Sequence, residues 1–419
     1  MREYSNATQE AAKMPVVRPE QIHLERCIRH IIYRDIEANV GDNVRRTEFG
    51  RKLTVAASQS SDASHLPLGG SGLGLDSLST ISAATAVARF FDMGVSGLDD
   101  YLVFDETLGE WGNRVAQHLD TLGPDATLVF ETSGSTDNPK SVRKSLAELQ
   151  FEVLALGATV VPKGTRRIVS LVPARHIFGW LFTVQLPAKF RIPVFEATFR
   201  GTATVFEQLG SGDFVVGTPF NWEMLRSLGR DFPPGVRGVT AAGPMAPELR
   251  SGLKTAGLVS LLEVFGSTET GGIGWRADGE SDFKLLPHCS RFGDCLVSKF
   301  SGIPLPLQDH LDWRDACRFL PRERIDHAVQ IAGVNVSLRK VRDVLCASDL
   351  VDDAAVRLEG NRLKAFVVPA SSIAIEQLVQ ALEMHMSQAL EPAARPAHYD
   401  FGEELPRNAM GKPSDWRTG

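Results

Sequence analysis

VFETSGSTDNPK, residues 129–140, joins a short apolar run to a turn that is rich in hydroxyl groups and ends in a lysine. Backbone N–H groups and hydroxyls in such a turn can hold phosphate oxygens, and Lys140 can add a positive charge. The turn does not have the Gly-x-x-x-x-Gly-Lys spacing of a Walker loop. Because Ser, Gly, Asn and Pro are also the usual turn formers, composition alone fits a phosphate-binding loop and an ordinary surface turn equally well.

Apolar runs alternate with helical patterns around and after this turn. Strands are expected at 126–130, 167–172 and 214–217, and helices at 145–156, 203–209 and 221–228. This alternation predicts a large α/β domain with a mostly parallel sheet. After about residue 326 the pattern changes to short strands and helices, which indicates a smaller α+β domain.

The composition limits the class of protein. The chain has 419 residues, a length that suits one large or two to three ordinary domains, and its 43% hydrophobic and 23% charged residues are ordinary for a soluble globular protein. A net charge of −6 provides no basic surface, so nucleic acid is not an expected partner. We expect no membrane span, because no apolar stretch is long enough, and no signal peptide. The five scattered cysteines, an odd number, indicate reduced thiols and a cytoplasmic location.

The turn at 132–140 resembles the nucleotide-binding signature of the adenylate-forming superfamily, Thr-Ser-Gly-Ser-Thr-Gly-x-Pro-Lys. This superfamily includes acyl- and aryl-CoA ligases, the adenylation domains of nonribosomal peptide synthetases, and luciferases. Asp137 stands where the family has its last Gly, and a carboxylate beside a triphosphate is unfavourable unless it points away or meets a cation. The resemblance implies that these residues bind the nucleotide: Thr132, Ser133, Gly134, Ser135, Thr136 and Lys140.

Two further motifs follow in the family's order. Residues 175–180, Arg-His-Ile-Phe-Gly-Trp, resemble the family's His/aromatic-Gly element. The resemblance implies that His176 lies between the nucleotide and acyl pockets and takes part in catalysis, whereas a lone His would more often be a neutral residue on a packed face. Residues 239–245 resemble the strand and turn that flank the adenine, which implies contacts from Ala242 and Gly243. Small residues let the backbone approach a flat base closely.

Residues 262–270, Leu-Glu-Val-Phe-Gly-Ser-Thr-Glu-Thr, resemble a more specific element of the family. The resemblance implies that Phe265, where Tyr is commoner, and Gly266 border the adenine and acyl sites. It also implies catalytic roles for Thr268, as a phosphate contact, and for Glu269, as the magnesium ligand. Mg²⁺ prefers hard oxygen ligands and bridges substrate phosphates, so the residue type fits. For Glu269 alone, a solvated carboxylate is the alternative.

The C-terminal part carries the remaining motifs of this resemblance. Asp309 is the candidate for the carboxylate that accepts hydrogen bonds from the ribose hydroxyls, and Arg324 for the family's nucleotide-binding Arg. Asp326 is implied as the hinge and Gly333 as a residue lining the thiol tunnel, although Arg324 and Asp326 also suit a surface ion pair. Lys412, in Leu-Pro-Arg-Asn-Ala-Met-Gly-Lys, is implied to bridge the substrate carboxylate and the α-phosphate, where a cation stabilises the transition state.

The part of the chain ahead of residue 132 is shorter than in most of this family and has a different pattern. Asp76-Ser77-Leu78 heads an amphipathic helix and resembles the acyl or peptidyl carrier fold, in which the Ser bears phosphopantetheine. Ser77 is then the candidate attachment site, at a helix N-terminus that favours a phosphate. The alternative is that Asp76 and Ser77 form a capped helix start in a shortened adenylation domain.

These patterns predict four regions along the chain. We expect a flexible tail at 1–20, a helical carrier-like region at 21–120, an adenylate-forming core at 121–326 and a mobile C-terminal domain at 327–419. Aromatic side chains that would wall an aryl or fatty acyl pocket are Phe178, Trp180, Phe220, Trp222 and Phe265.

The resemblance implies that ATP and magnesium are used to activate a small carboxylic acid, aryl or fatty acyl, as its acyl-AMP with release of pyrophosphate. The acyl group would then pass to the thiol of CoA or of phosphopantetheine on a carrier. An acyl carrier protein or a synthase is the protein partner that this chemistry would allow. Two alternatives remain open: a catalytically weakened nucleotide- or acyl-binding homologue, and a carrier-type interaction module.

Overall fold

The computed structural model describes residues 16–39, 52, 63–131, 140–293, 295–324, 329–370, 374–406 and 416. These residues form two compact units. The large unit contains the described residues up to Glu131, with Ser141–Leu307 and Leu311–Leu320. The small unit contains Lys140, Gln308–His310 and the described residues from Pro321 onward. Among the described helices, none is both long enough and apolar enough to cross a membrane.

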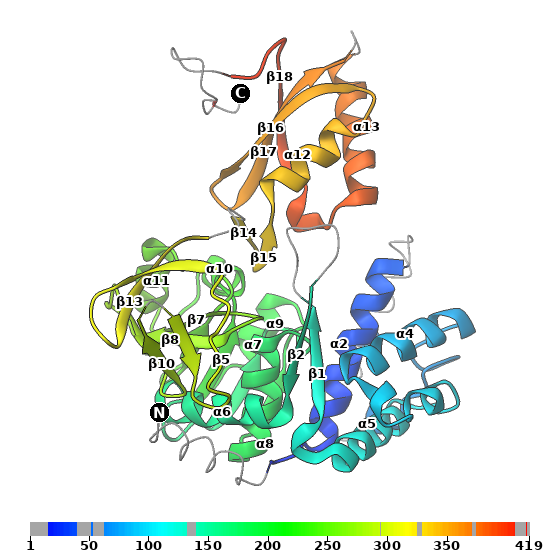
Figure 1. Cartoon of the computed structure of the whole chain (residues 1–419), viewed down its shortest axis with the longest axis vertical. Helices are drawn as coiled ribbons and strands as arrows, with labels where there is room; N and C mark the ends of the chain where they lie inside the picture. Colours follow the sequence, from blue (N-terminus) through cyan, green and yellow to red (C-terminus); the bar gives the residue numbers. More distant parts are fainter. Residues whose placement is uncertain are drawn as a thin grey trace. The chain divides into compact units, whose positions relative to one another are not determined.

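A nine-stranded sheet has the order β12-β13-β9-β8-β7-β6-β5-β3-β4, and its larger part forms the centre of the large unit (Figure 1). Neighbouring strands from β4 to β7 are parallel, whereas β8, β9 and β13 join in antiparallel pairs. The strands are β3 (Arg167–Ser170), β4 (Val194–Glu196), β5 (Asp213–Gly217), β6 (Arg237–Thr240), β7 (Ser260–Ser267), β8 (Gly271–Arg276), β9 (Phe283–Leu285), β12 (Asp309–Trp313) and β13 (Arg318–Arg324). The predicted α/β domain is therefore confirmed, but its sheet is mixed, because the chain reverses after Ser267.

Both faces of the parallel strands are covered, as this sheet type requires. In β5, Phe214 and Val216 belong to one core cluster and Val215 to another, because successive side chains point to opposite faces. The second cluster lies under α9 (Thr202–Glu207), α10 (Pro219–Ser227) and α11 (Pro247–Thr255). The first is covered by α6 (Leu146–Thr159), α7 (Ile177–Trp180), the π-helical η5 (Leu181–Gln185) and α8 (Leu186–Phe190).

The N-terminal helices share the first of these clusters with the sheet. They are α2 (Gln21–Asn39), α4 (Ser77–Phe90) and α5 (Leu108–Leu122), with the short helical turns η1 (Ala63–His65), η2 (Met93–Val95), η3 (Asp99–Val103) and η4 (Gly123–Asp125). Phe90 of α4 packs edge-on against Phe130, with ring centroids 5.4 Å apart, and lies 6.0 Å from Trp180. The described residues of the helical region are therefore part of the large unit and share its core, and the region's likeness to a carrier stays a prediction.

A two-stranded hairpin carries the hydroxyl-rich turn. Its strands are β1 (Thr127–Glu131) and β2 (Ser141–Ser145), paired from Thr127 opposite Ser145 to Glu131 opposite Ser141. Figure 1 shows this hairpin within the large unit, where β1 contacts α4. A second hairpin in the large unit is formed by β10 (Cys289–Phe292) and β11 (Cys295–Ser298).

The small unit has its own hydrophobic core. A three-stranded sheet of β16 (Val351–Glu359), β17 (Arg362–Pro369) and β18 (Pro396–Phe401) packs with α12 (Leu338–Cys346), α13 (Ile375–Ala389) and the turn η6 (Pro392–Ala394). The short hairpin of β14 (Val329–Ile331) and β15 (Val334–Val336) joins the same core. This arrangement agrees with the small α+β domain expected from the sequence.

Candidate active site

Several predicted site residues of the large unit lie at the carboxyl ends of parallel strands of the sheet. His176 comes after β3, Ala242 and Gly243 come after β6, Phe265 and Gly266 lie near the end of β7, and Thr268 and Glu269 follow that strand. The pairing of Thr240 with Glu263 places the ends of β6 and β7 side by side. Ligands of open α/β sheets bind outside the carboxyl ends of the parallel strands, and these residues lie at the carboxyl ends of β3, β6 and β7.

The turn after β6 holds an alanine in a conformation that usually requires glycine. Ala242 has a φ of 63°, in the left-handed region where a β-carbon costs about 1 kcal/mol. Such strain persists where the surrounding structure imposes it, and it is common beside ligands. Ala242 and the adjoining Gly243 are half-buried. The turn therefore has small side chains and a backbone held in one conformation.

A β-bulge shapes the end of β7. The register between β7 and β8 shifts between Phe265 and Gly266, and a β-carbon on Gly266 would lie 2.0 Å from the carbonyl oxygen of Gly271, so only glycine fits there. The Ser267 N–H donates to Thr270 Oγ1 at 3.0 Å, and the Thr270 N–H donates to Ser267 Oγ at 3.2 Å. This closed turn presents the half-buried Thr268 and Glu269 at its tip.

A buried carboxylic acid, which the sequence motifs did not identify, binds the strand that follows this turn. Glu152 of α6 is 5% exposed, and one of its oxygens accepts the N–H of Gly272 at 2.6 Å. A β-carbon on Gly271, whose φ is 71°, would lie 2.3 Å from the other oxygen. Burial raises the pKa of Glu152 to about 8, against the opposing effects of the Gly272 N–H and Lys144. At neutral pH this carboxyl therefore holds its proton.

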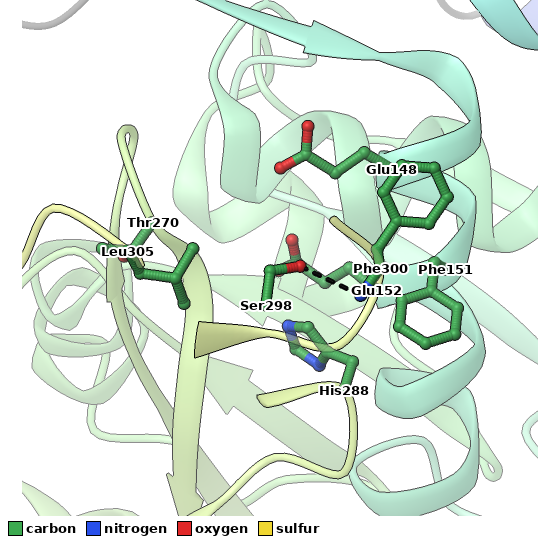
Figure 2. Close-up of a pocket in the computed structure, with 8 residues that line it drawn as sticks. All are labelled: Glu148, Phe151, Glu152, Thr270, His288, Ser298, Phe300 and Leu305. Carbon is green, nitrogen blue, oxygen red and sulfur yellow. Dashed lines mark hydrogen bonds between the residues drawn. The ribbon is translucent and has the colours of Figure 1, made fainter. Parts of the chain in front are cut away.

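Glu152 lines a cavity next to the turn (Figure 2). The other lining residues are Glu148, Phe151, Thr270, His288, Ser298, Phe300 and Leu305. Burial lowers the pKa of His288 to about 4, so its ring is neutral when Glu152 is protonated. The signal that could have revealed this feature is an acidic residue on the apolar face of a predicted helix, since Glu152 lies at helical spacing from Leu149 and Leu156.

His176 occupies the N-cap position of α7. The residue is exposed, yet the surrounding protein atoms lower the pKa of its ring well below the usual value, and the charges of Arg175 and Arg34 add to this effect. The imidazole is therefore neutral at physiological pH. The neighbouring Gly179 is required, because a β-carbon there would lie 2.0 Å from the carbonyl oxygen of Pro173.

The structure does not gather the five aromatic side chains into one wall. Trp180 and Trp222 are both fully buried, and they belong to clusters on opposite faces of the sheet. Phe220 is 50% exposed on α10. Phe178 packs against Phe182 of η5. The expected aromatic wall is therefore corrected: Trp180 and Trp222 lie on α7 and α10, which cover opposite faces of the sheet, and the short motifs do not reveal which face a helix covers.

Other predicted residues lie elsewhere or outside the described part. Ser77 is exposed at the first position of α4, where Asp76 caps the helix by accepting the Ser79 N–H at 2.8 Å. In the small unit, Lys140 is exposed, Asp309 begins β12, and Gly333 has a φ of 82° in the β14–β15 turn. Residues 132–136, Asp326, Lys412 and the side chain of Arg324 lie outside the described residues.

The base of the phosphate-turn hairpin is tied to the end of α4 by one carboxylate. Asp92, at φ 51°, accepts from Thr127 Oγ1 at 2.6 Å and from Arg143 Nε at 3.1 Å and Nη2 at 3.2 Å. The Arg143 guanidinium is the main reason that the pKa of Asp92 lies below its usual value. These contacts hold both strands that lead to the turn.

We expect Asp92→Asn to raise the KM for ATP about two- to fivefold with kcat little changed, because Asn tolerates the backbone conformation but loses the ion pair. The measurement is pyrophosphate release against ATP concentration. Arg230→Gln is the matched control, since it breaks an exposed pair with Glu207 at 3.2 Å that does not touch the hairpin. An unchanged KM for Asp92→Asn would show that the carboxylate does not position the turn.

The comparisons with known proteins agree with this geometry. The AMP-binding enzyme family matches residues 98–297, and the AMP-binding enzyme C-terminal domain matches residues 340–412. The chain is 41% identical to a 4-coumarate–CoA ligase of Rhodobacter capsulatus over 82% of this chain and 90% of that one. It is 39% identical to a 4-coumarate–CoA ligase of Cereibacter sphaeroides over 82% and 84%.

Solved structures share the fold at low sequence identity. An o-succinylbenzoate CoA synthetase double mutant from Bacillus subtilis matches with a TM-score of 0.59 and 17% identity, over 71% of this chain and 70% of that one. An amide bond synthetase from Marinactinospora thermotolerans matches with a TM-score of 0.59 and 16% identity, over 88% and 93%.

The fold, the strand-edge motifs and these relatives define an AMP-forming acid–thiol ligase. The chain belongs to the AMP-binding, adenylate-forming enzyme family, among its acyl- and aryl-CoA ligases. The family match begins at residue 98, inside the region in which the sequence suggested a carrier.

Proposed function

We propose that this enzyme uses ATP to activate a hydroxycinnamate-type aryl acid and transfers the acyl group to CoA in the cytoplasm. The observation that carries the proposal is the 41% identity to a 4-coumarate–CoA ligase over 90% of that relative. The naming of these relatives as CoA ligases supports CoA as the thiol acceptor.

The first step forms the acyl-adenylate. A carboxylate oxygen of the acid attacks the α-phosphorus of ATP, the new P–O bond forms as the bond to pyrophosphate breaks, and pyrophosphate leaves. Thr268 and Glu269 suit this step, because they lie together at the tip of a closed turn at the sheet edge. A magnesium ion held by Glu269 would neutralise phosphate charge. Lys412 would stabilise the charge that develops between carboxylate and phosphate.

The second step transfers the acyl group to sulfur. The thiol sulfur attacks the acyl carbonyl carbon, the bond to AMP breaks, the thiol proton goes to solvent, and AMP leaves. We assign to the small domain a rotation about Asp326 that removes Lys412 and brings Gly333 to the thiol path, as hinge closure does in other two-step enzymes. The neutral His176 suits a place beside an acid substrate, because an uncharged ring does not compete with Lys412 for its carboxylate.

A screen of acids tests the proposal. We expect ATP-dependent pyrophosphate release with 4-coumarate, with kcat/KM at least about tenfold above fatty and amino acids, and product formation only when CoA is added. Chain-matched phenylpropanoate and octanoate are controls for size alone. Release of pyrophosphate only with fatty acids would contradict the substrate class. Absence of both release and ATP binding with every acid would favour the weakened binding homologue.

A further inference from the structure

Helix α2 carries polar side chains that are buried in the large unit. Arg26, Arg29 and His30 are 4%, 5% and 2% exposed. They meet Glu196, which ends β4 and is 6% exposed. Removing charged groups from water costs free energy, unless groups of opposite charge lie close enough to compensate. The AMP-binding match begins at residue 98. The residues that α2 contributes to the cluster come before that point, and Glu196 comes after it.

His30 connects this cluster to the motif that contains His176. Its Nδ1 accepts the backbone N–H of Ala174 at 2.8 Å, so the ring proton is on Nε2. Nε2 faces Glu196 Oε2 at 3.5 Å, a mainly electrostatic contact at this distance. The ring also packs against Phe199, with centroids 4.9 Å apart. The position and the tautomer of His30 are thus set from two sides.

The charges of the cluster maintain this arrangement. Burial alone would raise the pKa of Glu196, but His30, Arg26 and Arg29 together hold it well below its usual value, so the carboxylate is ionised. Arg26 Nε lies 3.6 Å from the same Glu196 oxygen that faces His30. An ionised Glu196 favours the proton on Nε2 of His30, which leaves Nδ1 free to accept from Ala174.

The segment between Ala174 and Trp180 links the position of the Ala174 backbone to that of His176. The His176 N–H donates to the Pro173 carbonyl at 3.2 Å, and the Trp180 N–H donates to the His176 carbonyl at 2.7 Å. Close contact of Gly179 with Pro173 leaves the segment little room to move. A displacement of Ala174 therefore displaces His176, two residues further along the chain.

We propose that His30 is a positioning residue for the acid-activating step: with Glu196 it fixes the Ala174 backbone and thereby the place of His176. This proposal rests on the proposed function, in which His176 lies beside the acid. It assigns to the N-terminal helix α2 a contribution to adenylate formation. Because ATP is held by other motifs, the effect falls on the use of the acid and leaves the KM for ATP nearly unchanged.

The test compares substitutions of His30 in the full-length enzyme. We expect His30→Phe, which keeps the ring but loses both nitrogens, to lower kcat/KM for the acid about 10- to 100-fold, with the KM for ATP within about twofold of wild type. His30→Gln restores an acceptor and a donor, so it is expected to recover most of the activity. His23→Phe is the matched control, since His23 lies on the same helix and is 7% exposed.

Hydrogen exchange supplies a readout that does not depend on activity. Peptides covering Ala174 are expected to exchange faster in His30→Phe than in wild type, and at the wild-type rate in His23→Phe. If His30→Phe does not fold, Glu196→Gln takes its place, with an expected 3- to 10-fold loss in kcat/KM for the acid. Unchanged acid kinetics in the folded variants, or equal losses in His23→Phe, would overturn the proposal. A wild type that activates no acid would instead refute the proposed function, and the exchange rates would still test the Ala174 contact.

Discussion

Lys412→Ala is expected to lower the rate of acyl-adenylate formation about 10²- to 10³-fold and to leave the thiol-transfer half-reaction close to wild type. The reason is that negative charge grows between the carboxylate and the α-phosphate only in the first step. In the second step, charge develops at the acyl carbonyl and on sulfur. The first half-reaction is measured by pyrophosphate release, and the second by transfer from preformed acyl-adenylate to CoA.

The matched controls separate charge from position. Lys412→Arg keeps the charge and should lose less activity than Lys412→Ala, although its larger group will not fit a site built for an ammonium. Lys254→Ala removes an exposed lysine on α11 and should change neither half-reaction. Equal losses in both half-reactions of Lys412→Ala would show that this lysine serves binding in general and has no special part in the first step.

Glu152→Gln is expected to remove a pH dependence from the stability of the fold. Glu152 has a folded pKa of about 8 against an ordinary value of 4.5, so the folded state keeps a proton that the unfolded chain releases. The stability that this proton contributes is fully present below pH 4.5 and is lost as the pH rises through 8. Gln resembles the protonated acid and does not titrate, and its oxygen still accepts the Gly272 N–H.

At pH 8 the Gln variant should therefore be more stable than wild type, by up to a few kcal/mol, and at pH 5 the two should be close. Glu152→Ala should be less stable than Glu152→Gln at every pH, because the buried Gly272 N–H loses its acceptor, at a cost of about 1–3 kcal/mol. Thermal unfolding midpoints from pH 5 to pH 8 measure both effects. Glu207→Gln, which removes an exposed carboxylate of α9 paired with Arg230 at 3.2 Å, is the control. Parallel pH profiles for wild type and Glu152→Gln would contradict the buried protonated acid.

Local patterns in the sequence predicted much of the architecture. The helical pattern at 145–156 corresponds to α6 (Leu146–Thr159), and the apolar run at 214–217 lies within β5 (Asp213–Gly217). Both signals are short-range, since periodicity and turn residues act within one element. The order of the motifs also indicated the family before any geometry was known, because each motif is contiguous in the chain.

Hydrogen bonds between distant segments could not be predicted from such local patterns. The Gly272 N–H meets a carboxyl from 120 residues earlier in the sequence, and the Ala174 N–H meets a histidine 144 residues earlier. The helical region predicted at 21–120 contains α2, but the sequence did not show that Arg26 and His30 would be buried. A charged residue on a helix is normally solvated, and only the packing of another element over it reverses that expectation.

The sequence by itself determined the family, the alternation of strands and helices, and the order in which His176, Ala242, Phe265 and Glu269 appear. These features depend on contiguous residues, whose local preferences need no partner. The tertiary structure alone decided that the sheet turns antiparallel after Ser267, that Glu152 supports this turn, and that Trp180 and Trp222 lie on opposite faces. These features depend on burial and on contacts between distant segments, which exist only once the chain has packed.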